Sequence, residues 1–110
     1  MPDDGDGAIT LHDLSIEVRR REGRAFVCGH EEGEAFRVIG ENLVFGGPAS
    51  FSLYAMAALL PLLPAKQRTE IGGDWMAEDT DIACPDAACG AVFRIRRIGK
   101  SLFAREAANT

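Results

Sequence analysis

A chain of 110 residues has room for one hydrophobic core but not for two, and a hydrophobic content of 46% is that of a globular protein. The formal net charge of −5 argues against general nucleic-acid binding, because clustered Lys and Arg make the phosphate contacts. We therefore expect one folded domain that binds no nucleic acid.

The first residues form an acidic segment without an apolar stretch, so we expect a disordered acidic tail over residues 1–8 and no export signal. The longest apolar run, residues 51–63, is shorter than the roughly 20 residues of a membrane-spanning helix. The three cysteines are an odd number, which favours reduced thiols over a disulfide framework. Together these features predict a cytoplasmic protein that does not enter a membrane.

Strand-like alternation dominates the first third of the chain. Apolar residues alternate with polar and charged ones between residues 9 and 21, which is the pattern of a half-buried strand. Shorter strands are expected at residues 25–28 and 34–39, because glycine-containing turns separate these apolar runs.

A single helix is expected in the middle of the chain. Residues 51–60 are apolar on nearly every side, Ser50 is a suitable N-cap, and Pro61 ends the helix. A helix without a polar face belongs at the centre of a small protein or between two subunits. We therefore expect the helix to be central, with a homodimer as an open alternative.

The last third predicts two more strands. A polar connection over residues 67–81 leads into a strand ending at Cys84, and a turn then leads to a final strand at residues 91–98. Residues 100–110 are expected to form a C-terminal tail. Tight turns join antiparallel strands. The prediction for residues 9–99 is thus one α+β domain, a small and mostly antiparallel sheet of four or five strands packed around one central hydrophobic helix.

The order of motifs resembles a family of small uncharacterised prokaryotic proteins of roughly this length. The family pattern has a Cys before Gly-His-x-x-Gly-Asp-x-Phe, an apolar helix ending Leu-Leu-Pro, and Ala-Cys-Pro-Asp-Pro before a Val-Phe-Arg strand. The matching residues lie between about 9 and 98: Gly29-His30-Glu31-Glu32-Gly33-Glu34-Ala35-Phe36, Leu59-Leu60-Pro61, Ala83-Cys84-Pro85-Asp86 and Ala91-Val92-Phe93-Arg94. The resemblance implies the architecture and no particular reaction.

This chain departs from the family pattern at its thiols. Cys28 directly precedes Gly29, whereas family members leave a wider gap. Ser52 stands where the family often has a cysteine, and Cys89 is an additional one. These departures argue against a metal site shared with the family, because the loss of one thiol ligand would open the coordination shell.

Four residues form a candidate metal site. Cys28 and His30 are two residues apart, so on an extended strand both side chains leave the same face. With Cys84 and Cys89 they make a Cys3His set, which suits a closed structural zinc or iron site. Against this, the two spacings differ from those of common zinc knuckles. The alternative is that Cys28 is a small buried hydrophobe and His30 an exposed turn residue.

A second candidate is a catalytic set made of Cys84, His30 and Asp86. Pro85 fixes the turn that carries the thiol and the carboxylate. His30 would serve as base and Asp86 would orient it, which gives Cys84 nucleophilic or acid–base chemistry. Asp86 can instead be an Asx-turn residue. Cys84 and Cys89 can also form a redox pair.

Four further residues are candidates for binding a small anionic ligand. Ser52 and Tyr54 lie at the start of the expected helix, where backbone N–H groups attract anions. Arg94 would add a positive charge, and Trp75, which follows Gly72-Gly73-Asp74, would close over the pocket as part of a lid. The alternative for Trp75 is that it caps the edge of the core.

Two functional hypotheses follow. The first is a small cytoplasmic domain that binds or transforms a small polar or anionic molecule at the Cys/His/Asp site, by lyase, isomerase or hydrolase chemistry. The second is a non-catalytic accessory protein that self-associates and carries a structural Cys/His metal site.

Overall fold

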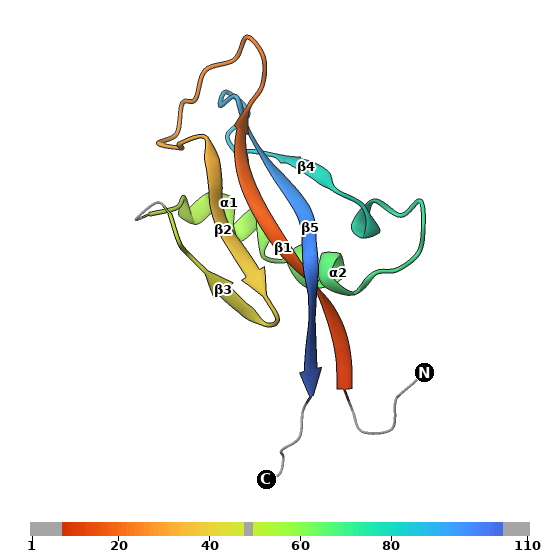
Figure 1. Cartoon of the computed structure of the whole chain (residues 1–110). Coiled ribbons are helices and arrows are strands. Elements are labelled where there is room, and N and C mark those ends of the chain that lie inside the picture. The colour runs from red at the N-terminus through yellow and green to blue at the C-terminus, as the bar shows by residue number, and fades with distance from the viewer. Residues whose placement is uncertain (1–7, 48–49, 105–110) are drawn as a thin grey trace.

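The computed structural model describes residues 8–47 and 50–104, and its centre is one five-stranded antiparallel sheet (Figure 1). The strand order is β3-β2-β1-β5-β4. The strands are β1 (Ala8–Arg20), β2 (Gly33–Ile39), β3 (Asn42–Val44), β4 (Thr80–Ala83) and β5 (Ala91–Ala104). The predicted α+β class with a small antiparallel sheet is confirmed.

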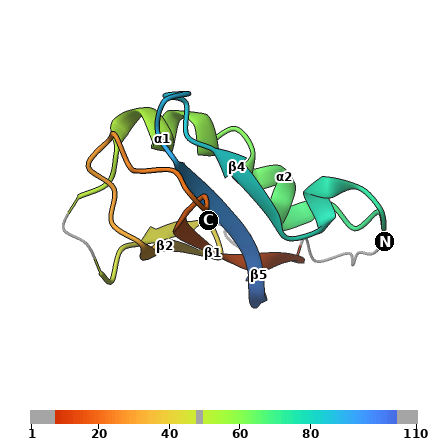
Figure 2. The ribbon, with the colours of Figure 1, turned by 90° about the horizontal axis from the view of Figure 1, so that it is seen from above.

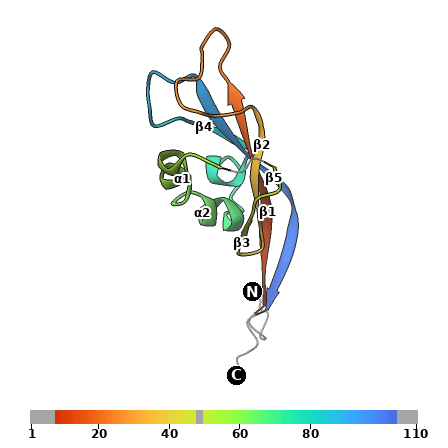
Figure 3. The same cartoon turned by 90° about the vertical axis from the view of Figure 1, so that its left-hand side faces the viewer.

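The longest pairing joins β1 to β5. It runs from Ala8 opposite Ala104 to Arg20 opposite Ala91, with one register shift after Asp13. The other strands pair only with the half of this ribbon nearest Arg20, so its opposite end extends beyond the body of the molecule (Figure 3). The first residue of β5 lies beside the last residue of β1, where the loops over residues 21–32 and 84–90 leave the sheet.

Two short helices cover one face of the sheet (Figures 2 and 3). They are α1 (Leu53–Leu59) and α2 (Leu63–Arg68), and a 3-10 turn, η1 (Trp75–Ala77), follows. Ser52, rather than the expected Ser50, caps α1, because its hydroxyl oxygen accepts the Ala55 N–H at 3.2 Å. The helix expected over residues 51–60 is present as α1, which ends before Pro61, and α2 after it was not expected. The helices pack on one face of the sheet, so part of the apolar surface of α1 is exposed.

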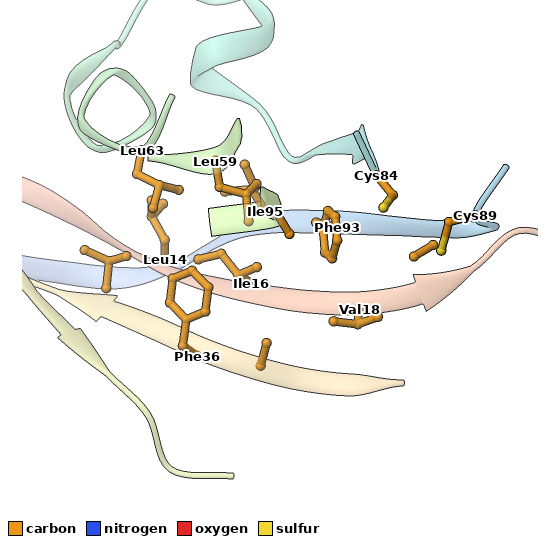
Figure 4. Packing of buried hydrophobic residues seen from close by; sticks show 14 residues of the cluster. Leu14, Ile16, Val18, Phe36, Leu59, Leu63, Cys84, Cys89, Phe93 and Ile95 are labelled. Carbon is orange, nitrogen blue, oxygen red and sulfur yellow. The ribbon is translucent and has the colours of Figure 1, made fainter. Parts of the chain in front are cut away.

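The hydrophobic core fills the space between the helices and the sheet (Figure 4). Along β1 and β5, every second side chain points into the space between the sheet and the helices. Leu59 of α1 packs against these side chains from the helix side. Its largest fully buried apolar members are Phe36, Phe93, Leu14, Ile16, Leu59 and Ile95. Cys84 and Cys89 lie at one end of the core, so the thiols are part of the packed interior.

Three segments differ from the sequence-based expectation. Residues 25–28 do not form a strand but belong to an irregular loop that packs on the hairpin between β4 and β5. β5 continues past Ile98 to Ala104, because β1 offers it a partner strand over the whole length. The short strand β3 was not expected. The expected tail residues 1–7 and 105–110 lie outside the described part of the chain.

No helix within residues 8–47 and 50–104 is long and apolar enough to cross a membrane.

Candidate metal centre

The site is built where two loops meet. One loop, residues 21–32, connects β1 to β2, and the other, residues 84–90, connects β4 to β5. Backbone hydrogen bonds join them: the Arg21 N–H donates to the Gly90 carbonyl and the Gly90 N–H donates to the Ala25 carbonyl, both at 2.8 Å. The pairing of β1 with β5 thus brings together segments about 60 residues apart in the sequence.

Four metal-ligating side chains converge at this junction. One ligand atom from each of Cys28, His30, Cys84 and Cys89 lies within 4.8 Å of the other three. Cys28 and His30 come from the first loop, and Cys84 and Cys89 come from the second. The cluster expected from the sequence is therefore present, and it can hold a metal ion.

Two separations within the cluster fit tetrahedral coordination. Zn–S bonds of about 2.3 Å and Zn–N bonds of about 2.0–2.1 Å place two sulfurs about 3.8 Å apart, and a sulfur and a nitrogen about 3.6 Å apart, in a regular tetrahedron. The Cys28 and Cys84 Sγ atoms are 3.8 Å apart, and Cys84 Sγ is 3.7 Å from His30 Nε2. Both separations match the edges of a zinc tetrahedron, and the two sulfurs are not joined by a disulfide in this structure.

The Cys89 sulfur lies in a setting that favours a thiolate. Burial alone would raise its pKa, but the backbone N–H groups of Cys28, Val27 and Ala91 outweigh burial and lower the pKa to about 7. The Val27 nitrogen is 3.3 Å from this Sγ. Backbone N–H groups directed at a sulfur stabilise its negative charge, which is the charge state that binds a metal.

Cys28 shows the opposite effect. Burial raises its pKa to about 12, and the nearby sulfurs of Cys84 and Cys89 add to this. A thiolate at Cys28 would lie close to a thiolate at Cys89, and this repulsion is unfavourable unless a cation lies between the two sulfurs. A divalent metal ion at the centre of the cluster would supply that charge.

His30 is held by aromatic packing. Its ring lies edge-on to Phe93 and Phe26, with ring centroids 5.1 Å and 6.0 Å away. This burial lowers the pKa of His30 and keeps the imidazole neutral near pH 7. Neutral imidazole is the form that ligates metals.

The proposed catalytic set is only partly assembled. Cys84 and His30 are adjacent, but no hydrogen bond among the described residues joins His30 to Asp86. Asp86 Oδ1 accepts the Ala88 N–H at 3.0 Å, which is the Asx-turn arrangement, and its Oδ2 lies 3.9 Å from Cys28 Sγ. The carboxylate therefore shapes the turn and faces a thiol rather than orienting the imidazole.

A cavity of about 890 Å³ opens beside the cluster. Three of the four clustered residues line one part of it, and the residues before and within the first turn of α1 line another. Ser52 and Tyr54 are among them, as the sequence led us to expect. The cavity thus lies between the two loops and the start of the helix.

Two of the expected ligand-binding residues lie elsewhere. Arg94 does not line the cavity, because it alternates with the inward-pointing Phe93 on β5 and pairs with Asp81 at 2.8 Å. Trp75 is also absent from the cavity lining, because η1 packs beside α2 and places the ring 5.5 Å from the Lys66 ammonium. The structure therefore does not bring these two residues to Ser52 and Tyr54.

Sequence reasoning did not find several residues of the site. The N–H groups of Val27 and Ala91 are backbone donors, and a backbone donor leaves no trace in residue type. Phe51 and Glu31 also line the cavity. Their positions next to Ser52 and His30 are the signal that would have pointed to them.

No family model, curated protein or solved structure matches this chain. The resemblance to a family of small prokaryotic proteins therefore stays a prediction, and the function is argued from the geometry of the site.

Proposed function

We propose that this chain is a zinc-binding domain in which Cys28, His30, Cys84 and Cys89 hold one structural Zn²⁺. The observation that carries the proposal is the match of the Cys28–Cys84 and Cys84–His30 separations, 3.8 Å and 3.7 Å, to the edges of a zinc tetrahedron. In this view the domain is a non-catalytic binding module, and the metal fixes the shape of its binding surface.

The donor set favours zinc. Three thiolates and one neutral imidazole are a common set for tetrahedral structural zinc, and iron is the other metal that accepts such ligands. Zn²⁺ would offset two of the three thiolate charges, which supports the ionisation of Cys28 despite its raised pKa. The N–H groups around Cys89 would stabilise the remaining charge.

The role of the metal would be to join the two loops. Residues 21–32 contain no strand or helix, and most of their side chains are exposed or half-buried, so packing alone holds this loop weakly. Apparent zinc-binding energies of about 10–16 kcal/mol in zinc-finger peptides show that one ion can order such a segment. We expect the metal-free protein to keep its sheet and loosen this loop.

A closed site disfavours the catalytic alternative. With four protein ligands the metal has no open position for water or substrate, and a metal-bound Cys84 is not a free nucleophile. The second candidate function is thiol chemistry on a small molecule. It is supported by the adjacency of Cys84 and His30 on the cavity wall. It applies only to a metal-free protein.

The test is metal content by elemental analysis, combined with titration of the thiols in the native state. We expect about one zinc per chain and three thiols that react only after a chelator is added. Substitution with Co²⁺ should give the intense visible bands of a tetrahedral thiolate site. A protein that takes up neither zinc nor iron and has one fast-reacting thiol at Cys84 would overturn the proposal in favour of thiol chemistry.

A further inference from the structure

The cavity beside the cluster carries negative charge. Among its lining residues in the described part of the chain, Glu31 and Asp86 are carboxylates, and none is Lys or Arg. Three thiolates around Zn²⁺ would leave one more negative charge on the cavity wall. A small anion would therefore meet repulsion there, whereas a cation would be attracted.

The remaining lining is largely apolar and aromatic. Val18, Ala35 and Phe51 line the cavity, and Leu53 and Tyr54 also contribute to it. The last two are each 75% exposed, so they reach well out into solvent. A lining of this kind suits a ligand with a long apolar part that ends in a cation, because aromatic faces also attract ammonium and guanidinium groups.

The size and the rim favour a macromolecular ligand. A volume of about 890 Å³ is near the upper end of the roughly 300–1,000 Å³ that holds drug-sized molecules. A small molecule inside it would leave Leu53, Tyr54 and the nearby Val27 uncovered, with Val27 itself 61% exposed. A peptide chain lying across the opening would cover them.

We infer that this cavity binds a basic peptide segment of a partner protein, with a Lys or Arg side chain entering beside Phe51 toward Glu31 and Asp86. The inference rests on the proposed function in one respect, because the metal centre forms part of the cavity wall. Neighbouring apolar residues of the peptide contact Leu53 and Tyr54. The carboxylates select the charge of the entering side chain, and the exposed apolar rim supplies most of the contact area.

Fluorescence anisotropy tests the inference on the zinc-loaded protein with three labelled heptapeptides. They share the pattern Ala-Leu-x-Ala-Leu-x-Ala, in which x is Lys, Glu or Ser. We expect the Lys peptide to bind tightest and to weaken as salt is raised, since screening reduces charge attraction. The Glu peptide should not bind.

Variants locate the contact. Glu31→Gln and Asp86→Asn should each weaken the Lys peptide about two- to fivefold, the range of single exposed ion pairs, and asparagine at position 86 preserves the Asx turn. Glu32→Gln is the matched control, because Glu32 carries the same charge beside Glu31 but does not line the cavity. Tyr54→Ala should weaken the binding of every peptide that binds. Because the Tyr54 side chain is exposed, this substitution should leave the fold unchanged.

Several results would overturn the inference. Equal binding of the Lys and Glu peptides would do so, and so would no binding of any peptide. Equal losses of affinity for Glu31→Gln and Glu32→Gln would also contradict it. So would full displacement of the Lys peptide by n-hexylamine at a concentration equal to that of the peptide. Elemental analysis of the same samples separates the two proposals. Full zinc without peptide binding rejects only the peptide site. Peptide binding without any metal rejects only the zinc site.

Discussion

A Cβ atom built on Gly90 would lie 2.5 Å from Cβ of Arg24, which is closer than real side chains approach. The two loops of the metal centre therefore meet backbone to backbone, directly after the ligand Cys89. This contact sets how far the ligands of the first loop are from those of the second.

Substituting Gly90→Ala should force the loops apart. Such overpacking costs about 1–3 kcal/mol of unfolding free energy, and we expect a weaker zinc affinity as well. Gly99→Ala in β5 is the control, because its Cβ would meet only Asp13 Oδ2 at an ordinary 3.7 Å. Urea unfolding and chelator competition measure the two effects. Equal stability of the two variants would contradict the assigned role of Gly90.

The two histidines offer a matched pair for testing the ligand set. His30→Asn removes a proposed ligand and should weaken zinc binding by about 100-fold or more, since even outer partners of metal ligands change affinity 10–100-fold. His12→Asn should leave zinc affinity unchanged, because Nε2 of His12 is bonded to Glu70 at 2.9 Å, away from the cluster. Competition with a zinc-binding dye gives both affinities. Similar losses in both variants would exclude His30 as a ligand.

Stability of the metal-free protein should fall on acidification. Burial lowers the pKa of His30, so below the ordinary value of 6.5 the unfolded chain takes up a proton that the folded protein does not. This part of the stability is present above pH 6.5 and is lost as pH falls toward the lowered pKa. Urea unfolding between pH 5 and 8 measures it. The His30→Asn variant should lack this component of the pH dependence, and an unchanged slope would contradict the assignment.

Zinc binding should release fewer protons as pH rises through about 7. Cys89 has a pKa of about 7, so it gives up a proton on binding at pH 6 but is already mostly ionised at pH 8. Cys28, with a pKa of about 12, gives up its proton at both values. Calorimetry in buffers of different ionisation enthalpy counts the protons. We expect zinc binding to release about one proton fewer at pH 8 than at pH 6. An equal number of released protons at the two pH values would contradict the lowered pKa of Cys89.

Oxidation of the metal-free protein should join Cys28 to Cys84. Their sulfurs are 3.8 Å apart and both line the cavity, whereas Cys89 does not line it and is nearly fully buried. With hydrogen peroxide, the two thiols give up two protons and two electrons, and one disulfide and two water molecules form. Peptide mapping by mass spectrometry identifies the linkage. A bond between Cys84 and Cys89 would contradict this prediction, and the zinc-loaded protein is the protected control.

The sequence predicted the strands better than the site. Regular alternation over residues 9–21 is a local signal, and β1 follows it almost residue for residue. The exposure of Arg94 on the face opposite Phe93 and Ile95 was also within reach of this alternation. Trp75 was not, because its position depends on how η1 packs against α2, which is a tertiary contact.

The four metal ligands were expected to lie together because Cys28 and His30 were placed on one face of an extended strand. The structure brings them together in a different way. Cys28 and His30 do not leave one face of a strand. A tight turn, in which the His30 N–H donates to the Cys28 carbonyl at 2.8 Å, directs both inward. The unusual spacing of Cys84 and Cys89 argued against zinc, but knuckle spacings describe sites made within one local motif. Here the pairing of β1 with β5 assembles the cluster from distant segments.

The ribbon of β1 and β5 also determines how the molecule responds to force. Ala8 and Ala104 are opposite each other, so tension applied at these two residues would peel the strands apart one backbone pair at a time. Hydrogen bonds broken one after another resist far less than bonds loaded together. The rupture would start at the end of the ribbon that projects from the body and reach Arg20 and Ala91 last. The four clustered ligands lie beyond that point, so they would separate only after the ribbon had opened.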